Sequence, residues 1–172
     1  AESRFGKQHP GLAQYRWLLA RLLTRAGDLA TAERLDEETL AIMERALGPD
    51  HPGVADAEIR LAHHRFAMGR EREALAGALK GETIARRHFL ATARSQPAPE
   101  TLRSEALRIS GLDLGLSIVT VTDLARIGQD AVSRTWDEVV RSRAMILDEL
   151  AARHRFEIEA ADSEVRRRAA SL

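Results

Sequence analysis

The sequence predicts an all-α protein in which helical hairpins stack in series and longer helices follow at the C-terminal end. Three observations lead to this fold class. Ala, Leu, Arg and Glu dominate while aromatic residues reach only 4%, a balance that favours helices packed through small residues over sheets. Apolar residues recur at helical spacing in several segments. A pattern of residues also returns after 42 positions, which is typical of helical repeat architectures.

The repeat is clearest in two short stretches, "FGKQHPG" at 5–11 and "LGPDHPG" at 47–53. They start 42 residues apart, so His9 corresponds to His51. We interpret this His as a turn or cap residue between hairpins, not as a ligand. Further matches at the same spacing are Gly6 with Gly48, Ala13 with Ala55, Leu19 with Leu61, Ala20 with Ala62, Gly27 with Gly69, Ala32 with Ala74, Ile42 with Ile84 and Arg45 with Arg87.

Within one period the pattern predicts a pair of helices. The first covers residues 11–26 and ends at Gly27, where a left-handed C-terminal residue is favoured. Asp28 suits the N-cap of the second helix, which stops at Gly48. Pro52 then suits the first turn of the next helix, where its missing N–H costs nothing. One such hairpin cannot cover its own apolar face, so hairpins stack in series. We interpret residues 5–10 as the tail of a preceding unit.

The stretch "LLARLLTRAGDLATAERLDEETLAIMERALGPDHPGVADAEIRLA" (18–62) resembles a tetratricopeptide repeat (TPR) of the 42-residue form found in kinesin light chains and in many bacterial proteins. The resemblance covers about 5–89 and implies a right-handed array with a concave groove for peptides or helices. Asp36 and Thr39 replace the usual aromatic residue and Ala. Gly77 and Gly81 stand where larger residues are normal, so we expect a second unit that is longer or less regular.

The 42-residue period disappears downstream, and we divide the chain into residues 1–95, the tetratricopeptide-like repeats, and residues 96–172, helices that cap the array or lead to a further domain. "QPAP" at 96–99 marks the break. We expect 117–122 to be helical despite its β-branched residues, because a lone strand has no partner. A further break falls at 127–129. The last helix carries an apolar stripe, and we expect its Trp136 to lie in the core. The stripe consists of Trp136, Val139, Val140, Ile146, Leu147, Leu150, Ala151 and Ile158.

The segment "TWDEVVRSRAMILDELAARHR" (135–155) resembles the helix ahead of the caspase-like CHAT domain in bacterial tetratricopeptide–CHAT proteins, and "ETIARRHFLATARS…GLDLGLSI" fits the linker of that family. The resemblance implies a bacterial, cytoplasmic parent whose peptidase domain would follow Leu172. The His–Cys dyad of that domain is absent, because the chain contains no Cys.

The sequence favours no catalytic, metal or cofactor site. Lys plus Arg and Asp plus Glu both number 26, a balance that favours neither nucleic acid nor a membrane as partner, and no apolar run reaches the length of a span. Neighbouring residues on a helix point about 100° apart, so His63 and His64 are poorly placed to chelate a metal, and we expect structural or surface roles. The carboxylates at 36–38 are interpreted as a solvated face. We expect no enzyme activity in this fragment.

A protein-binding groove is the favoured functional surface. In the resembled family the first helix of each pair lines the groove, and transferring that pattern gives eight positions. They are Gln14, Trp17, Arg21, Arg25, Asp56, Ile59, His63 and Phe66. Trp17 is either exposed in the groove as an anchor flanked by Arg or packed on a neighbouring unit.

The sequence therefore predicts a non-catalytic scaffold for protein–protein interaction, the recognition part of a bacterial caspase-like (CHAT) peptidase. The alternative is the sensor repeat array of a signalling ATPase or transcription regulator. The partner would be a protein or peptide in the groove, and self-association through an open end of the array is a further expectation.

Overall fold

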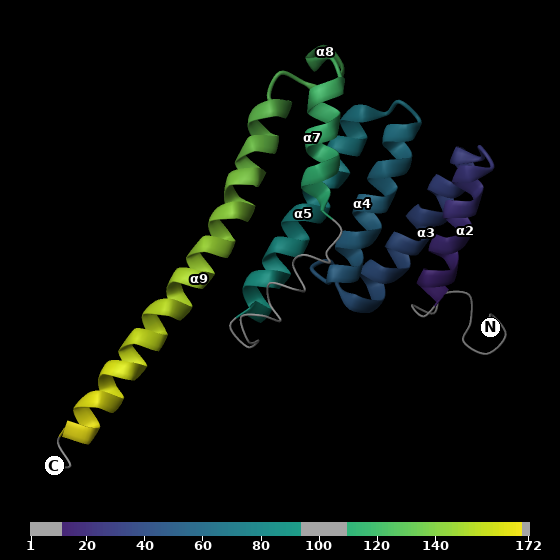
Figure 1. The fold of residues 1–172 in the computed structure, drawn as a ribbon. Coiled ribbons are helices and arrows are strands. Elements are labelled where there is room, and N and C mark those ends of the chain that lie inside the picture. The colour runs from purple at the N-terminus through teal and green to yellow at the C-terminus, as the bar shows by residue number, and fades with distance from the viewer. Residues whose placement is uncertain (1–11, 94–109, 170–172) are drawn as a thin grey trace.

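A computed structural model describes residues 12–93 and 110–169 and contains seven helices and no strand within those ranges. The all-α prediction is confirmed (Figure 1). The expected tail at 5–10 and the expected break at 96–99 lie outside the described residues. The helices are α2 (Ala13–Arg25), α3 (Leu29–Leu47), α4 (Pro52–Ala67), α5 (Glu71–Ala93), α7 (Gly111–Val121), α8 (Leu124–Ile127) and α9 (Ala131–Ala169).

The two hairpin turns have the same geometry, 42 residues apart. Gly27 and Gly69 have φ values of +85° and +72°, in the left-handed region that glycine enters at little cost. After α2, Gly27 N–H donates to Thr24 O and Asp28 N–H donates to Leu23 O. After α4, the N–H groups of residues 69 and 70 repeat both bonds with the carbonyls of residues 66 and 65. The predicted helix ends are confirmed, and each satisfies carbonyls that would otherwise lack partners.

The helix starts follow the predicted caps. The Asp28 carboxylate accepts from Thr31 N–H at 3.1 Å, and α3 begins at the next residue. His51 Nδ1 accepts from Gly53 N–H at 3.0 Å, and Pro52 is the first residue of α4. The repeated His is therefore a cap at His51, as the sequence predicts.

Helix α5 packs most extensively on α4, because small residues let the two backbones approach. A Cβ added at Gly81 would lie 2.5 Å from Ile59 Cγ1 and 2.9 Å from Ala55 O. One added at Gly77 would lie 3.2 Å from Ala62 Cβ. These two glycines therefore allow α5 to pack closely on α4. Helix α5 is also longer than α3, with 23 residues against 19.

One hydrophobic core joins the second hairpin to the C-terminal helices. The expected helix at 117–122 is confirmed up to Val121, where α7 ends, and Ile118 of α7 is fully buried. The core runs from α4 and α5 through α7 to the first residue of α9, so α7 and α9 continue the stack of hairpins. Its buried members are Ala62, Ala74, Leu75, Ala78, Leu79, Leu114, Ile118, Ile127 and Ala131.

Helix α9 packs on α5 through small and polar residues, which corrects the expected apolar stripe. Trp136 is 56% exposed and does not lie in the core. The buried side of α9 carries Ala131, Thr135, Glu138, Ser142 and Met145. Across this contact Ser142 Oγ donates to Glu82 Oε1 at 2.9 Å, and Arg86 lies 3.0 Å from Glu138. Met145 packs on Phe89.

Candidate functional site

The predicted groove face is formed by the neighbouring helices α2 and α4, and Trp17 lies between two arginines on it. The guanidinium carbon of Arg21, one turn along α2, is 5.3 Å from the centroid of the Trp17 ring. The corresponding atom of Arg60, on α4, is 5.0 Å away. Both distances are within cation–π range. Trp17 is half-buried, so its ring is held by the two cations and still reaches the surface.

Three of the other predicted groove residues, Gln14, Arg25 and His63, are exposed. Asp56 lies 3.6 Å from Arg60 in an i,i+4 ion pair, so it helps to orient one of the two cations beside Trp17. Arg60 was missed by sequence reasoning, because the residue transferred to that turn of α4 was its neighbour Ile59.

Two predicted groove residues turn inward. Ile59 is fully buried and lies against the α5 backbone near Gly81, so its assignment to the groove is wrong: the close approach of α4 and α5 leaves no surface at this position. Phe66 is partly buried and packs against the core shared with α7. Both contribute to the packing beneath the face.

The opposite side of α2 exposes a second apolar surface. Tyr15, Leu19 and Leu22 are 66%, 49% and 54% exposed, whereas Ala20 is fully buried. These side chains lie at helical spacing, as the sequence predicts, but no described residue covers them. Such a face is typical of a helix at the open end of a repeat stack.

A buried chain of polar groups links α2, α3 and α4. His64 Nε2 lies 2.8 Å from Thr24 Oγ1, and His64 Nδ1 lies 2.8 Å from Asp36 Oδ2. Asp36 is only 3% exposed, so its expected place on a solvated face is wrong. The carboxylate is retained inside because an imidazole of the next hairpin compensates its burial. Of the other two carboxylates in that run, Glu37 pairs with Arg65 and Glu38 approaches Arg16.

The order hydroxyl, imidazole, carboxylate is that of a hydrolase triad, but the proton positions differ. Thr24 Oγ1 donates its proton to Ala20 O at 2.8 Å, and a hydroxyl has only one proton to donate, so it does not donate to His64 Nε2. A general base would need that donation. The arrangement therefore acts as a tie between hairpins, in agreement with the structural role expected for His64.

The adjacent His63 is a titratable group on the α4 face. Partial burial of the ring, and secondly the neighbouring His64, lower the pKa of His63 below its ordinary 6.5. The neutral ring therefore predominates at pH 7, which leaves the arginines as the cations of this face.

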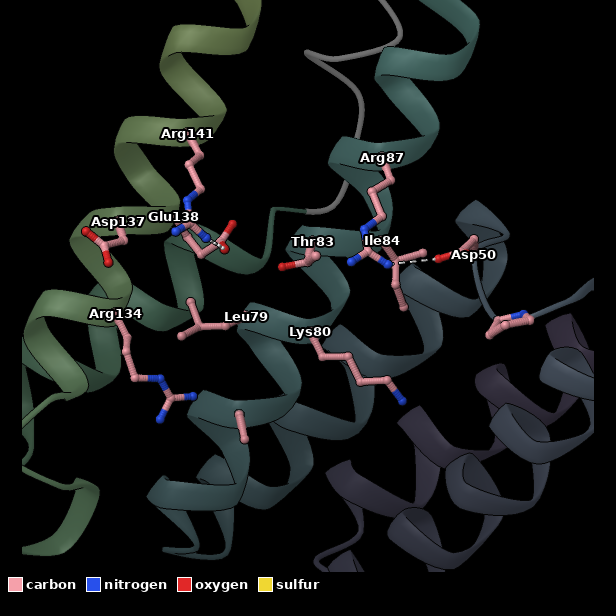
Figure 2. A pocket seen from close by; sticks show the side chains of 12 residues that line it. Asp50, Leu79, Lys80, Thr83, Ile84, Arg87, Arg134, Asp137, Glu138 and Arg141 are labelled. Carbon is pink, nitrogen blue, oxygen red and sulfur yellow. Dashed lines mark hydrogen bonds and ion pairs between the residues drawn. The ribbon is translucent and has the colours of Figure 1, made fainter.

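An open cavity of about 710 Å³ lies elsewhere, between α5 and α9 and beside the α3–α4 turn. Figure 2 shows Leu79 at its floor, Lys80 and Arg87 along α5, and Arg134 and Arg141 along α9. We call this cavity the α5–α9 trough. Sequence reasoning did not predict it, because its two walls are more than 40 residues apart in the chain.

Most cations around the α5–α9 trough are already paired. Arg87 lies 3.4 Å from Asp50, and Arg141 lies 3.2 Å from Glu138. Lys80 forms a close ion pair with Glu58, whose hydrogen bond raises the pKa of the lysine above its ordinary value. The trough thus carries compensated charge, unlike the exposed Arg21 beside Trp17.

Other site classes find no support in the described parts of the chain. Among residues 12–93 and 110–169, no three His, Asp or Glu side chains gather in a way that could hold a metal ion. No helix within those ranges is both long and apolar enough to cross a bilayer.

Comparison with known proteins agrees with the hairpin geometry. Residues 14–87 match the sequence profile of the tetratricopeptide repeat family. The matched segment covers α2 to α5 apart from the ends of that range, so the two hairpins are similar to tetratricopeptide repeats. No curated protein matches the sequence. Tetratricopeptide repeats bind protein partners, and the chain accordingly has the architecture of a protein–protein interaction scaffold.

Proposed function

We propose that the face formed by α2 and α4 binds an acidic segment of a partner protein, with Trp17 as the anchor. The observation that carries this proposal is the ring of Trp17 between Arg21 and Arg60. A large aromatic ring next to arginines is the side-chain combination most enriched at binding hot spots.

The charge of this face favours an acidic partner. Arg21 and Arg25 are exposed. Arg60 forms an ion pair with one acidic residue, Asp56. Because the protein as a whole has no formal net charge, this local excess of cations would steer and orient an acidic peptide.

The experiment is selection of binding peptides from a random display library, followed by titration against the chain. Binding is followed by the fluorescence anisotropy of a dye-labelled peptide, a readout that does not depend on either Trp of the chain. The double substitution Trp17→Ala, Arg21→Ala is expected to weaken binding about 30-fold or more, the cost of losing a hot spot. Tyr15→Ala, on the other side of α2, is the matched control. Unchanged affinity in the double variant would refute the assignment.

We further propose that recognition serves to control a caspase-like CHAT peptidase in a bacterial, cytoplasmic parent protein. Support comes from the resemblance of residues 135–155 to the helix ahead of that domain. A His–Cys domain encoded after Leu172 is the expected finding. A P-loop or DNA-binding module encoded before Ala1, with no such domain downstream, would favour the sensor array of a signalling ATPase or regulator instead.

A further inference from the structure

Helix α9 presents an apolar stripe to solvent on the side opposite its packed face. Val140, Leu147 and Ile158 are 62%, 67% and 49% exposed, and the intervening Ala144 and Ala151 are exposed as well. The spacing along 140, 144, 147, 151 and 158 is that of a heptad seam. The seam lies about half a turn from Thr135, Ser142 and Met145, which face the body.

The outer half of α9 continues away from the body. Figure 1 shows the helix passing the ends of its neighbours and running free. Every side chain described between 147 and 158 is exposed. An α-helix in water draws most of its stability from packing of an apolar face, so a helix of 39 residues that exposes such a face is incomplete as a single copy.

We propose that α9 pairs antiparallel with α9 of a second copy of this chain. In the favoured register Leu147 lies opposite Ile158 of the second copy, and Ala151 lies opposite its His154. The twofold axis repeats both contacts. Leu147 and Ile158 thereby bury each other's apolar side chains, and the small Ala151 leaves room for His154. The polar His154 fixes the register, a role that single polar core residues have in coiled coils.

The charges that flank the seam select this register. Asp148 and Arg155 are both exposed on one side of the stripe, and antiparallel pairing brings Asp148 next to Arg155 of the second copy, twice. A slip of one heptad, with Leu147 opposite Ala151, would bring Asp148 against Asp148 and Arg141 against Arg155. The slipped pairing is disfavoured because like charges face each other.

A parallel arrangement is less favourable for the same reason. It would place Asp137 beside Asp137 and His154 beside His154, on the axis between the helices. The antiparallel register matches the surface to itself with opposite charges and also keeps these like residues apart. An isologous interface, in which both copies use the same surface, requires that self-complementarity. It is therefore the argument for a second copy of this chain over an unrelated partner. The proposal is independent of the function proposed for α2 and α4.

The test is sedimentation velocity on the whole chain over a range of concentrations, where dimers are expected. Asp148→Arg and Arg155→Asp should each raise the dissociation constant about tenfold or more, because every substitution acts at two symmetric contacts. The charge-swapped double variant should restore it. Ala152→Arg, which adds a charge about 120° from the seam, is the control. Circular dichroism should show that all variants keep their helix content.

The direction of pairing can be tested by cross-linking, since the chain contains no Cys. A mixture of the Leu147→Cys and Ile158→Cys chains should form mixed disulfide dimers under oxidation, whereas each chain alone should form few. Disulfides within each single variant would contradict the antiparallel register. A monomer at high micromolar concentration, or a charge swap that fails to restore pairing, would overturn the proposal.

Discussion

The Nδ1 atom of His64 lies 2.8 Å from Oδ2 of Asp36, so a buried contact between an imidazole and a carboxylate joins the second hairpin to the first. Both residues are less than a tenth exposed. Because the pair spans α3 and α4, it fixes how consecutive units stack rather than how either hairpin forms.

Removal of either partner should destabilise the protein strongly, because the other polar group stays buried without its partner. We expect Asp36→Ala and His64→Ala each to lower the free energy of unfolding by about 3 kcal/mol. The double variant should cost less than the sum of the two. Urea unfolding measures all three, with the exposed Glu38→Ala as control. Additive losses would show that the two residues do not interact.

Gly81 of α5 and Gly115 of α7 should respond to alanine in opposite ways. Gly81→Ala should destabilise by roughly 1–3 kcal/mol, because its Cβ would meet Ile59 and the α4 backbone. Gly115→Ala should stabilise by up to about 1 kcal/mol, since its Cβ would find ordinary contacts at 3.5 Å or more and Ala favours the helix. Thermal unfolding of the two variants decides the sign, and equal signs would contradict the packing of α4 on α5.

Acidification should weaken the fold through His63. Its folded pKa lies below 6.5, so the unfolded chain binds the proton more readily. The stabilisation that neutral His63 contributes is therefore complete above about pH 6.5, its pKa in the unfolded chain. It is lost as the pH falls through the lower pKa that His63 has in the folded protein. His63→Gln should reduce the loss of stability between pH 7 and 5. An NMR titration that placed the pKa of His63 above 6.5 would contradict this sign.

The attachment of α9 should depend on Met145, whose apolar side chain packs on Phe89 at the end of a largely polar contact. We expect Met145→Ala to lower the free energy of local unfolding of α9 by about 2–4 kcal/mol. Hydrogen exchange should then rise in α9 while the α2–α5 hairpins keep their protection. Ala152→Ser, at an exposed position of the same helix away from the proposed seam, is the control. Uniform loss of protection would show that α9 and the repeats unfold as one unit.

The hairpins could be predicted because their signals are local. Gly27, Asp28, His51 and Pro52 each act on the nearest turn of backbone, and the 42-residue spacing repeats those signals. A segment with β-branched residues, 117–122, was correctly assigned to a helix because no strand was available to pair with it.

Residues whose roles depend on distant partners could not be predicted in this way. Periodicity places Trp136 on an apolar stripe, but it does not say whether the body meets that stripe or the side with Thr135 and Ser142. Asp36 is buried because His64 reaches it from another helix, 28 positions along the chain. Ile59 is buried because Gly81 lets α5 approach. Each of these depends on how the helices are placed in space.

Hydrogen exchange of the chain with a library-selected acidic peptide tests the proposed binding face most directly. Our account predicts added protection in α2 and α4, centred on Trp17 and Arg60, with the exchange of α5 and α9 unchanged. Protection confined to the α5–α9 trough would contradict it and would move the binding surface to the other helices of the array.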